Sequence, residues 1–138
     1  MAGLKAANAA PTWPTINGDW VPENISSFGE RTYTGLQQFT DHPIAVQFIH
    51  RMLAYLLTLL IIVWWVKAKK IATGKWFKNT LNLPLVVVLT QVLLGILTVL
   101  NASNTKALLW LGVAHQFTAM LLLMIITWML YILRIEKT

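Results

Sequence analysis

Three long apolar runs limit what this chain can fold into more than any other feature. They cover about residues 44–66, 83–100 and 106–133, and none contains an acidic side chain. A membrane-spanning helix needs about 20 mostly apolar residues, whereas membrane strands are segments of about ten residues with alternating polarity. The sequence therefore predicts an all-α membrane protein, with 44–138 as the transmembrane helical bundle.

Composition and charge support this class. Only 12% of the 138 residues are charged, about half of the roughly 25% found in soluble domains. The net charge of +6 does not require a nucleic-acid partner, because five lysines lie together between residues 67 and 78 without an acidic residue. Such a cluster is typical of a cytoplasmic loop. The absence of cysteine excludes disulfides, thiolate metal sites and covalent c-type haem attachment.

Residues 1–43 are polar and rich in turn-forming residues, so we expect an external loop region that lies against the membrane surface. Asn17-Gly18 is a strong turn signal. One short helix is expected around residues 35–40, and His42 is expected to be a solvated surface histidine.

The charge distribution predicts the orientation. Residues 1–43 carry two basic and four acidic side chains, whereas the lysine loop is strongly basic. Because basic loops stay in the cytoplasm, we expect residues 1–43 and 101–106 outside, and the lysine loop and C-terminus inside.

Two histidines lie within apolar runs, and an intramembrane ionisable side chain is a functional hypothesis by default. His50 lies seven or eight residues beyond the boundary at Asp41–Pro43, and His115 lies about nine or ten beyond Lys106. At 1.5 Å per residue, both lie roughly 11–15 Å from the outer ends of parallel helices. The two rings are therefore expected to face each other.

The chemistry of such a pair has two interpretations. Zinc usually takes four ligands, or three and a water, so two histidines suit it poorly. A haem iron needs only one or two axial side chains, and histidine is the usual one. The alternative is a pair of histidines hydrogen-bonded between helices. The polar and small stripe of Gln91, Gly95 and Thr98, like Gly112, fits a flat cofactor and close helix packing equally well.

Three further polar residues adjoin the histidines. Gln47 and Gln116 are candidates to bond an imidazole N–H or a substituent on a macrocycle. Arg51, next to His50, is a candidate partner for a haem propionate, and the alternative is snorkelling to lipid headgroups.

These residues resemble the C-terminal half of the haem A synthase family, and the similarity covers nearly the whole chain. The motifs that carry it are Ala2-Gly3-Leu4-Lys5-Ala6, Trp13-Pro14, Gly18-Asp19-Trp20-Val21-Pro22, Val46-Gln47-Phe48-x-His50-Arg51, Gln91-x-x-Leu94-Gly95-Ile96-x-Thr98 and His115-Gln116.

The resemblance implies a fold and an activity. The family has eight membrane helices in two pseudo-symmetric four-helix halves, each with a histidine pair for a haem. It oxidises haem O to haem A for cytochrome oxidase assembly, in the bacterial plasma membrane or the mitochondrial inner membrane. By resemblance, His50 and His115 would be the axial ligands of haem b, and therefore bind its iron, on the outer side.

Two departures from the family pattern matter. The substrate-binding N-terminal half is absent, and Gln47 stands where that half has a glutamate associated with catalysis. Residues 2–4 match the end of a helix whose beginning is missing. We therefore expect a fragment that begins at an internal methionine and contains three helices of a four-helix haem-binding half-bundle.

Such a fragment is not expected to be catalytically competent alone. Its expected partners are haem, membrane lipid, and either a missing N-terminal half or a second copy of the chain. Two alternatives stay open at this point: a non-catalytic b-type electron-transfer module, and a cofactor-free membrane assembly subunit.

Overall fold

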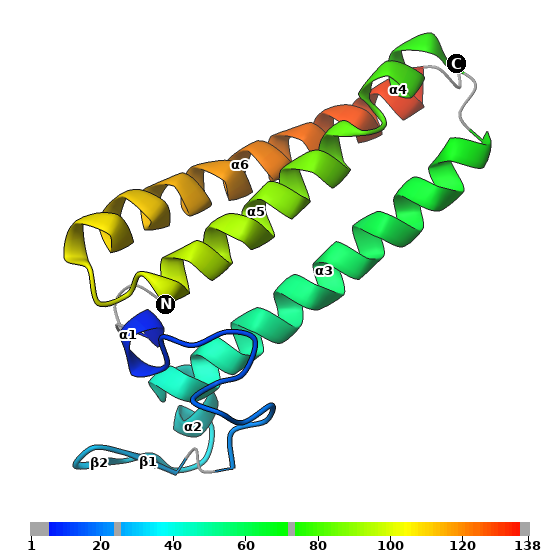
Figure 1. The fold of residues 1–138 in the computed structure, drawn as a ribbon. Coiled ribbons are helices and arrows are strands. Elements are labelled where there is room, and N and C mark those ends of the chain that lie inside the picture. The colour runs from blue at the N-terminus through cyan, green and yellow to red at the C-terminus, as the bar shows by residue number, and fades with distance from the viewer. Residues whose placement is uncertain (1–5, 24–25, 72–73, 136–138) are drawn as a thin grey trace.

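The computed structural model describes residues 6–23, 26–71 and 74–135, and three long helices dominate them (Figure 1). All three are long and apolar enough to cross a membrane, so the predicted helical membrane class is confirmed. The long helices are α3 (Pro43–Ile71), α5 (Leu83–Leu100) and α6 (Thr105–Ile135). The short elements are α1 (Ala6–Ala9), β1 (Ser27–Phe28), β2 (Arg31–Thr32), α2 (Gln37–Thr40) and α4 (Lys75–Thr80).

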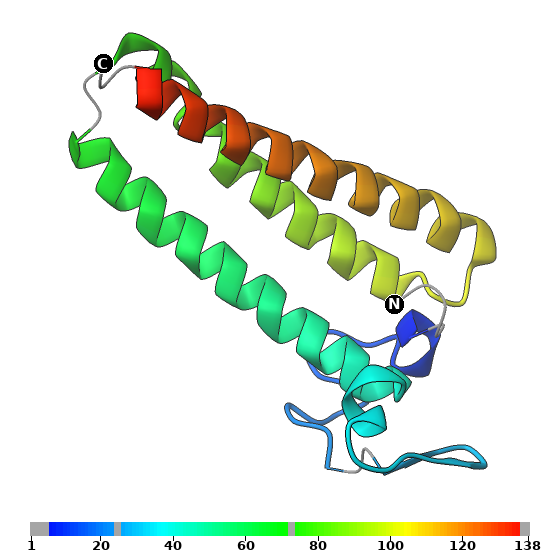
Figure 2. The ribbon, with the colours of Figure 1, turned by 180° about the vertical axis from the view of Figure 1, so that it is seen from behind.

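The three long helices lie side by side (Figures 1 and 2). α3 and α6 run in the same direction, and α5 runs antiparallel to both. The turn 101–104 joins α5 and α6 into a hairpin, and α3 packs against α5 less extensively. Apolar side chains join the helices toward the α4 end. One cluster consists of Ala68, Phe77, Leu81, Met129 and Ile132, and a second of Ile61, Val88 and Leu122.

The start of α3 corrects the prediction for His42. The side chain is fully buried rather than solvated. Its Nδ1 accepts the N–H of Ala45 at 3.3 Å, and its Nε2 lies 3.1 Å from the carbonyl of Ser27. A neutral ring that accepts at Nδ1 carries its proton on Nε2, so Nε2–H donates to Ser27. His42 thus caps α3 at its N-terminus, and Pro43 occupies the first helical position, where its missing N–H costs nothing.

The burial of His42 depends on the hairpin of β1 and β2, which the sequence did not predict. Strand residues pair Ser27 with Thr32 and Phe28 with Arg31 across a turn at Gly29. Phe28 and Tyr33 meet the His42 ring edge-on, with centroids 5.8 and 5.1 Å away.

The basic segment 67–78 is also more helical than predicted. Lys67, Lys69 and Lys70 lie on α3, which continues five residues beyond the expected end at Val66, and the other two lysines lie on α4. Ala68 packs inside the cluster toward the α4 end, and lysines in the last turn interact favourably with the helix dipole. These two effects extend the helix past its apolar run.

The Asn17-Gly18 turn predicted from the sequence is confirmed. Asn17 and Gly18 have φ angles of 54° and 105°, which asparagine and glycine adopt more readily than other residues. Ile16 and Asp19 bond each other across the turn, with N···O distances of 2.8 and 3.1 Å. This turn reverses the chain just after the stretch that contacts α3.

Candidate functional site

His50 of α3 and His115 of α6 come together, as their matched depth predicted. They lie seven residues after Pro43 and ten after Thr105, respectively. Their ring centroids are 6.2 Å apart, with the planes inclined by 66°. His50 is exposed and His115 is half-buried. Two helices that start at the same end of the bundle therefore present their imidazoles to each other.

The separation of the two rings can be compared with the distances expected for three kinds of contact. Two metal–imidazole bonds of about 2.0–2.1 Å, plus about 1.1 Å from each nitrogen to its ring centre, place the centroids about 6.3 Å apart. A direct N–H···N bond of about 3 Å would place them nearer 5 Å. The observed 6.2 Å is close to the first arrangement, and it also lies within the range of about 4.5–7 Å of an ordinary edge-to-face contact between two rings. Within the described residues no hydrogen bond joins the two rings.

His115 is held by α5 through two residues one helical turn apart. Its Nδ1 lies 3.1 Å from the carbonyl oxygen of Gln91, and its Nε2 lies 3.2 Å from the side-chain nitrogen of Gln91. A Cβ added at Gly95 would lie 3.1 Å from the ring carbon Cε1 of His115. The ring therefore rests on a surface made by Gln91 and Gly95.

Sequence reasoning identified the stripe of Gln91 and Gly95 but not its contact with His115. It proposed Gln47 and Gln116 as imidazole partners because they are close in sequence. The sequence did contain one signal for this contact: Gln91 and Gly95 lie four residues apart on the middle span, which places both on one helix face.

Gln47 and Arg51 contact the chain that precedes them. The Gln47 side-chain amide donates to the carbonyl of Ala10 at 3.0 Å. The Arg51 guanidinium donates to three carbonyls within residues 12–15, and its side chain is 7% exposed. These bonds run to Pro14 at 3.3 Å, Thr15 at 3.1 Å and Thr12 at 2.6 Å. Both side chains thus fasten residues 10–15, hereafter the strap, to the first turns of α3.

These contacts bear on the predicted cofactor roles without testing them. The Arg51 bonds use its two terminal nitrogens and, among the described residues, leave Nε–H without a protein acceptor. Gln116 is exposed on α6. The roles of Arg51, Gln47 and Gln116 toward a macrocycle stay predictions.

Within the described part of the chain, two buried amide oxygens beside the histidines lack hydrogen-bond donors. They belong to Gln47, one turn before His50, and to Gln91, which touches His115. A buried acceptor without a partner costs about 1–3 kcal/mol. Unsatisfied polar atoms therefore lie beside each histidine, and a bound group or water could satisfy them.

Among the described residues, the remaining polar and small side chains of the helices near the histidine pair form no hydrogen bond to either ring. The hydroxyls of Thr98 and Thr118 bond carbonyls of their own helices at 2.6 and 2.8 Å. An added Cβ at Gly112 would meet no atom within 4 Å. Across the described ranges, no three His, Cys, Asp or Glu side chains converge. Two histidines are too few ligands for a metal ion held only by protein, whereas an iron inside a macrocycle needs only one or two axial side chains.

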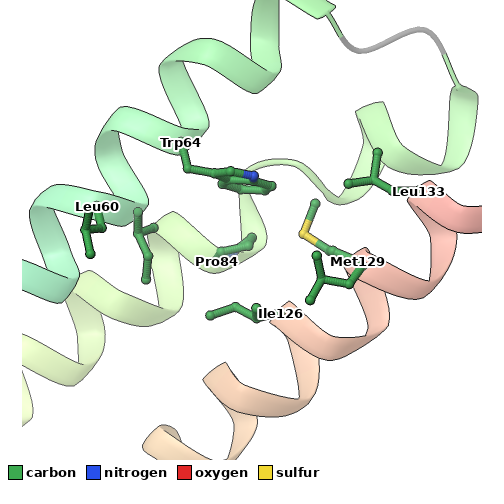
Figure 3. Close-up of a pocket in the computed structure, with 8 residues that line it drawn as sticks. Leu60, Trp64, Pro84, Ile126, Met129 and Leu133 are labelled. Atoms are coloured by element: carbon green, nitrogen blue, oxygen red, sulfur yellow. The ribbon is translucent and has the colours of Figure 1, made fainter.

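An apolar cavity of about 250 Å³ lies elsewhere in the bundle (Figure 3). Leu60 lies ten residues after His50, or about 15 Å along the helix, so the cavity is separate from the histidine pair. Its lining consists of Leu60, Ile61, Trp64, Pro84, Ile126, Met129, Leu130 and Leu133.

Comparison with known proteins identifies the family. A profile described as cytochrome oxidase assembly protein matches residues 1–127. The chain belongs to this family. Haem A synthases of Beijerinckia indica subsp. indica and Paracoccus denitrificans are 40% and 35% identical, each over 126 residues and 89% and 91% of this chain. That of Flavobacterium psychrophilum is 36% identical over 132 residues, or 95% of the chain.

The matched region is a part of each relative. It covers 33%, 31% and 37% of these three proteins, so the chain spans about a third of their length. No solved structure matches the chain. The predicted resemblance to the haem A synthase family is confirmed.

Proposed function

We propose that this chain is a haem-binding membrane part of a haem A synthase-type oxidoreductase, with His50 and His115 as the two axial ligands of one haem b. The observation that carries the proposal is that His50 and His115, on two parallel helices that start at the same end of the bundle, bring their ring centroids within 6.2 Å of each other. Family membership supports it independently. When bound, haem supplies one-electron redox chemistry.

The residues of the chain bind and enclose this group. His50 and His115 reach it from parallel helices, and Gln91 and Gly95 orient His115. The strap and α1, which contacts both α3 and α5, cover the same end of the bundle. Further polar contacts toward the macrocycle come from Arg51 Nε–H and Gln47 Oε1, which have no hydrogen-bond partner among the described residues, and from Gln116.

The conversion of haem O to haem A is proposed for the chain together with the remaining part of such an enzyme. Gln47 stands where the substrate-binding half of the family has a glutamate, and an amide cannot serve as a general base near neutral pH. A non-catalytic b-type electron-transfer module would use the same two ligands. A cofactor-free assembly subunit would use its histidines only as hydrogen-bond partners between helices, as His115 does with Gln91, and saturable haem binding would exclude it.

A haem titration tests this function. The chain in lipid nanodiscs is titrated with haem b and then supplied with haem O and a reductant under air. We expect saturation at one haem per chain, and no hydroxymethyl or formyl haem in the extract. Absence of saturable binding would contradict the haem site. Formyl haem from the chain alone would contradict the role assigned to Gln47, and product formed only with the remaining half would exclude the electron-transfer module.

We further propose an orientation in a bacterial plasma membrane or mitochondrial inner membrane. The turn at Asn104 lies outside and the segment at Lys75 inside, because short basic segments remain in the cytoplasm or matrix. The chain has no cysteine, so Asn104→Cys and Lys75→Cys each carry a single reactive thiol. A membrane-impermeant maleimide should label the first variant in intact cells and the second only after lysis. The reverse pattern would overturn this orientation.

A further inference from the structure

The contacts of His115 are compatible with one neutral form of its ring. The Gln91 backbone carbonyl can only accept a hydrogen bond, so the ring nitrogen 3.1 Å away, Nδ1, must carry the proton. Nε2 then holds a lone pair, and it accepts an N–H from the Gln91 side chain at 3.2 Å. In the opposite tautomer, the Nδ1 lone pair would face the carbonyl oxygen of Gln91, and neither atom could donate a hydrogen bond. One residue of α5 therefore contacts both ring nitrogens.

We propose that Gln91 is a positioning residue with two roles. Its backbone carbonyl fixes the Nδ1–H tautomer of His115, and its side-chain amide covers the Nε2 lone pair, which a haem iron would need. Displacement of the amide rests on the proposed haem function, whereas the tautomer is a property of the metal-free protein. A backbone carbonyl that binds one imidazole nitrogen and leaves the other for metal is a general way to orient a histidine ligand.

The amide of Gln91 is suited to being displaced. Among the described residues, the amide makes one hydrogen bond, to Nε2 of His115. Its Oε1 is buried and has no donor there. Moving the amide away from the ring therefore breaks one hydrogen bond. The backbone carbonyl cannot move with it, because it belongs to the helix. The Nε2 lone pair would thus become available to a haem iron once the amide moves, while the ring keeps its tautomer.

Gly95 allows the His115 ring to lie close to α5, because glycine has no Cβ. A methyl group there would lie 3.1 Å from Cε1 of His115, closer than ordinary van der Waals contact. The His50 ring has no such support, since the described part of the chain forms no hydrogen bond to it. The two histidines are therefore unequal: contacts with α5 orient His115 in the metal-free protein, whereas His50 would be free to adjust when a haem binds.

Replacing Gln91 with leucine tests whether its side-chain amide covers Nε2 of His115 or only packs against the ring. Gln91→Leu removes the amide and retains the backbone carbonyl. One net hydrogen bond corresponds to a factor of about 2–12 in affinity, so haem b should bind this variant about 2- to 12-fold more tightly than wild type. If the side chain only supported the ring by packing, affinity would be unchanged or lower.

Two companion variants complete the comparison. Thr90→Leu is the matched control, because Thr90 is exposed one residue away and bonds its own helix. It should bind haem as wild type does. Gly95→Ala should bind haem at least about fivefold more weakly, because overpacking displaces the ring.

The experiment combines nuclear magnetic resonance with haem titration. Metal-free chain carrying ¹⁵N-histidine is studied in nanodiscs, and the His115 signals are assigned by their absence in His115→Ala. We expect a protonated Nδ1 and an unprotonated Nε2 in wild type and in Gln91→Leu. An Nε2–H tautomer would overturn the first part of the proposal, and unchanged or weaker haem binding by Gln91→Leu would overturn the second. Wild type with the expected tautomer but without haem binding would instead contradict the proposed function and leave the tautomer assignment standing.

Discussion

Alanine at either His50 or His115 is expected to abolish the low-spin haem spectrum of the reconstituted chain. On the proposed assignment each ring would supply one of the two axial bonds, and the ring centroids lie 6.2 Å apart, close enough for one iron between them. Loss of one ring leaves iron with at most one protein ligand, which changes its spin state and removes most of the binding free energy. The measurement is the visible absorption of nanodisc-embedded variants after addition of one equivalent of haem b.

His42 provides the matched control for this loss. It is also buried, but its nitrogens bond Ala45 and Ser27 at the start of α3. His42→Asn keeps a side-chain acceptor suited to a helix N-cap, and it should show the wild-type spectrum. A low-spin spectrum retained by both His50→Ala and His115→Ala would remove the pair from the haem site.

Replacing Arg51 with methionine is expected to release the strap from α3. Arg51 donates to the carbonyls of Thr12, Pro14 and Thr15, and hydrogen bonds from a charged group contribute about 1.5–3 kcal/mol each. Losing them should raise amide hydrogen exchange in residues 10–19 at least about tenfold, since about 1.4 kcal/mol corresponds to that factor. Hydrogen–deuterium exchange with mass spectrometry measures this directly.

Two controls separate the strap from a role in haem binding. Arg31→Met makes the same change at an exposed position on β2 and should leave exchange in the strap unchanged. Arg51→Lys keeps the charge but loses the planar fork, so an intermediate effect is expected. A strap that stays protected in Arg51→Met while haem affinity falls would assign Arg51 to a propionate instead.

The sequence predicted the long helices and the histidine pair because both depend on local pattern. The middle span was expected at 83–100, the bounds of α5, and the third at 106–133, against Thr105–Ile135 in the structure. Apolar runs define such helices, and a constant rise per residue sets the depth of His50 and His115. Depth and parallel direction together were enough to bring the rings together.

The contacts that surround the histidines could not be predicted in this way. Arg51 meets Thr12 across 39 positions of the chain, and Gln91 meets His115 across 24. Hydrophobic periodicity carries no information on such pairs, because each joins a polar side chain to a backbone group or ring on another element. His42 was misassigned for the same reason, since a hairpin 15 residues earlier buries it.

Electron paramagnetic resonance of the ferric, haem-loaded wild-type chain tests the central claim most directly, because it reports how many strong axial ligands the iron has. Two imidazoles on one iron predict a six-coordinate, low-spin signal that accounts for all the bound haem. A high-spin, five-coordinate signal from the intact chain would contradict the claim that His50 and His115 bind the same iron.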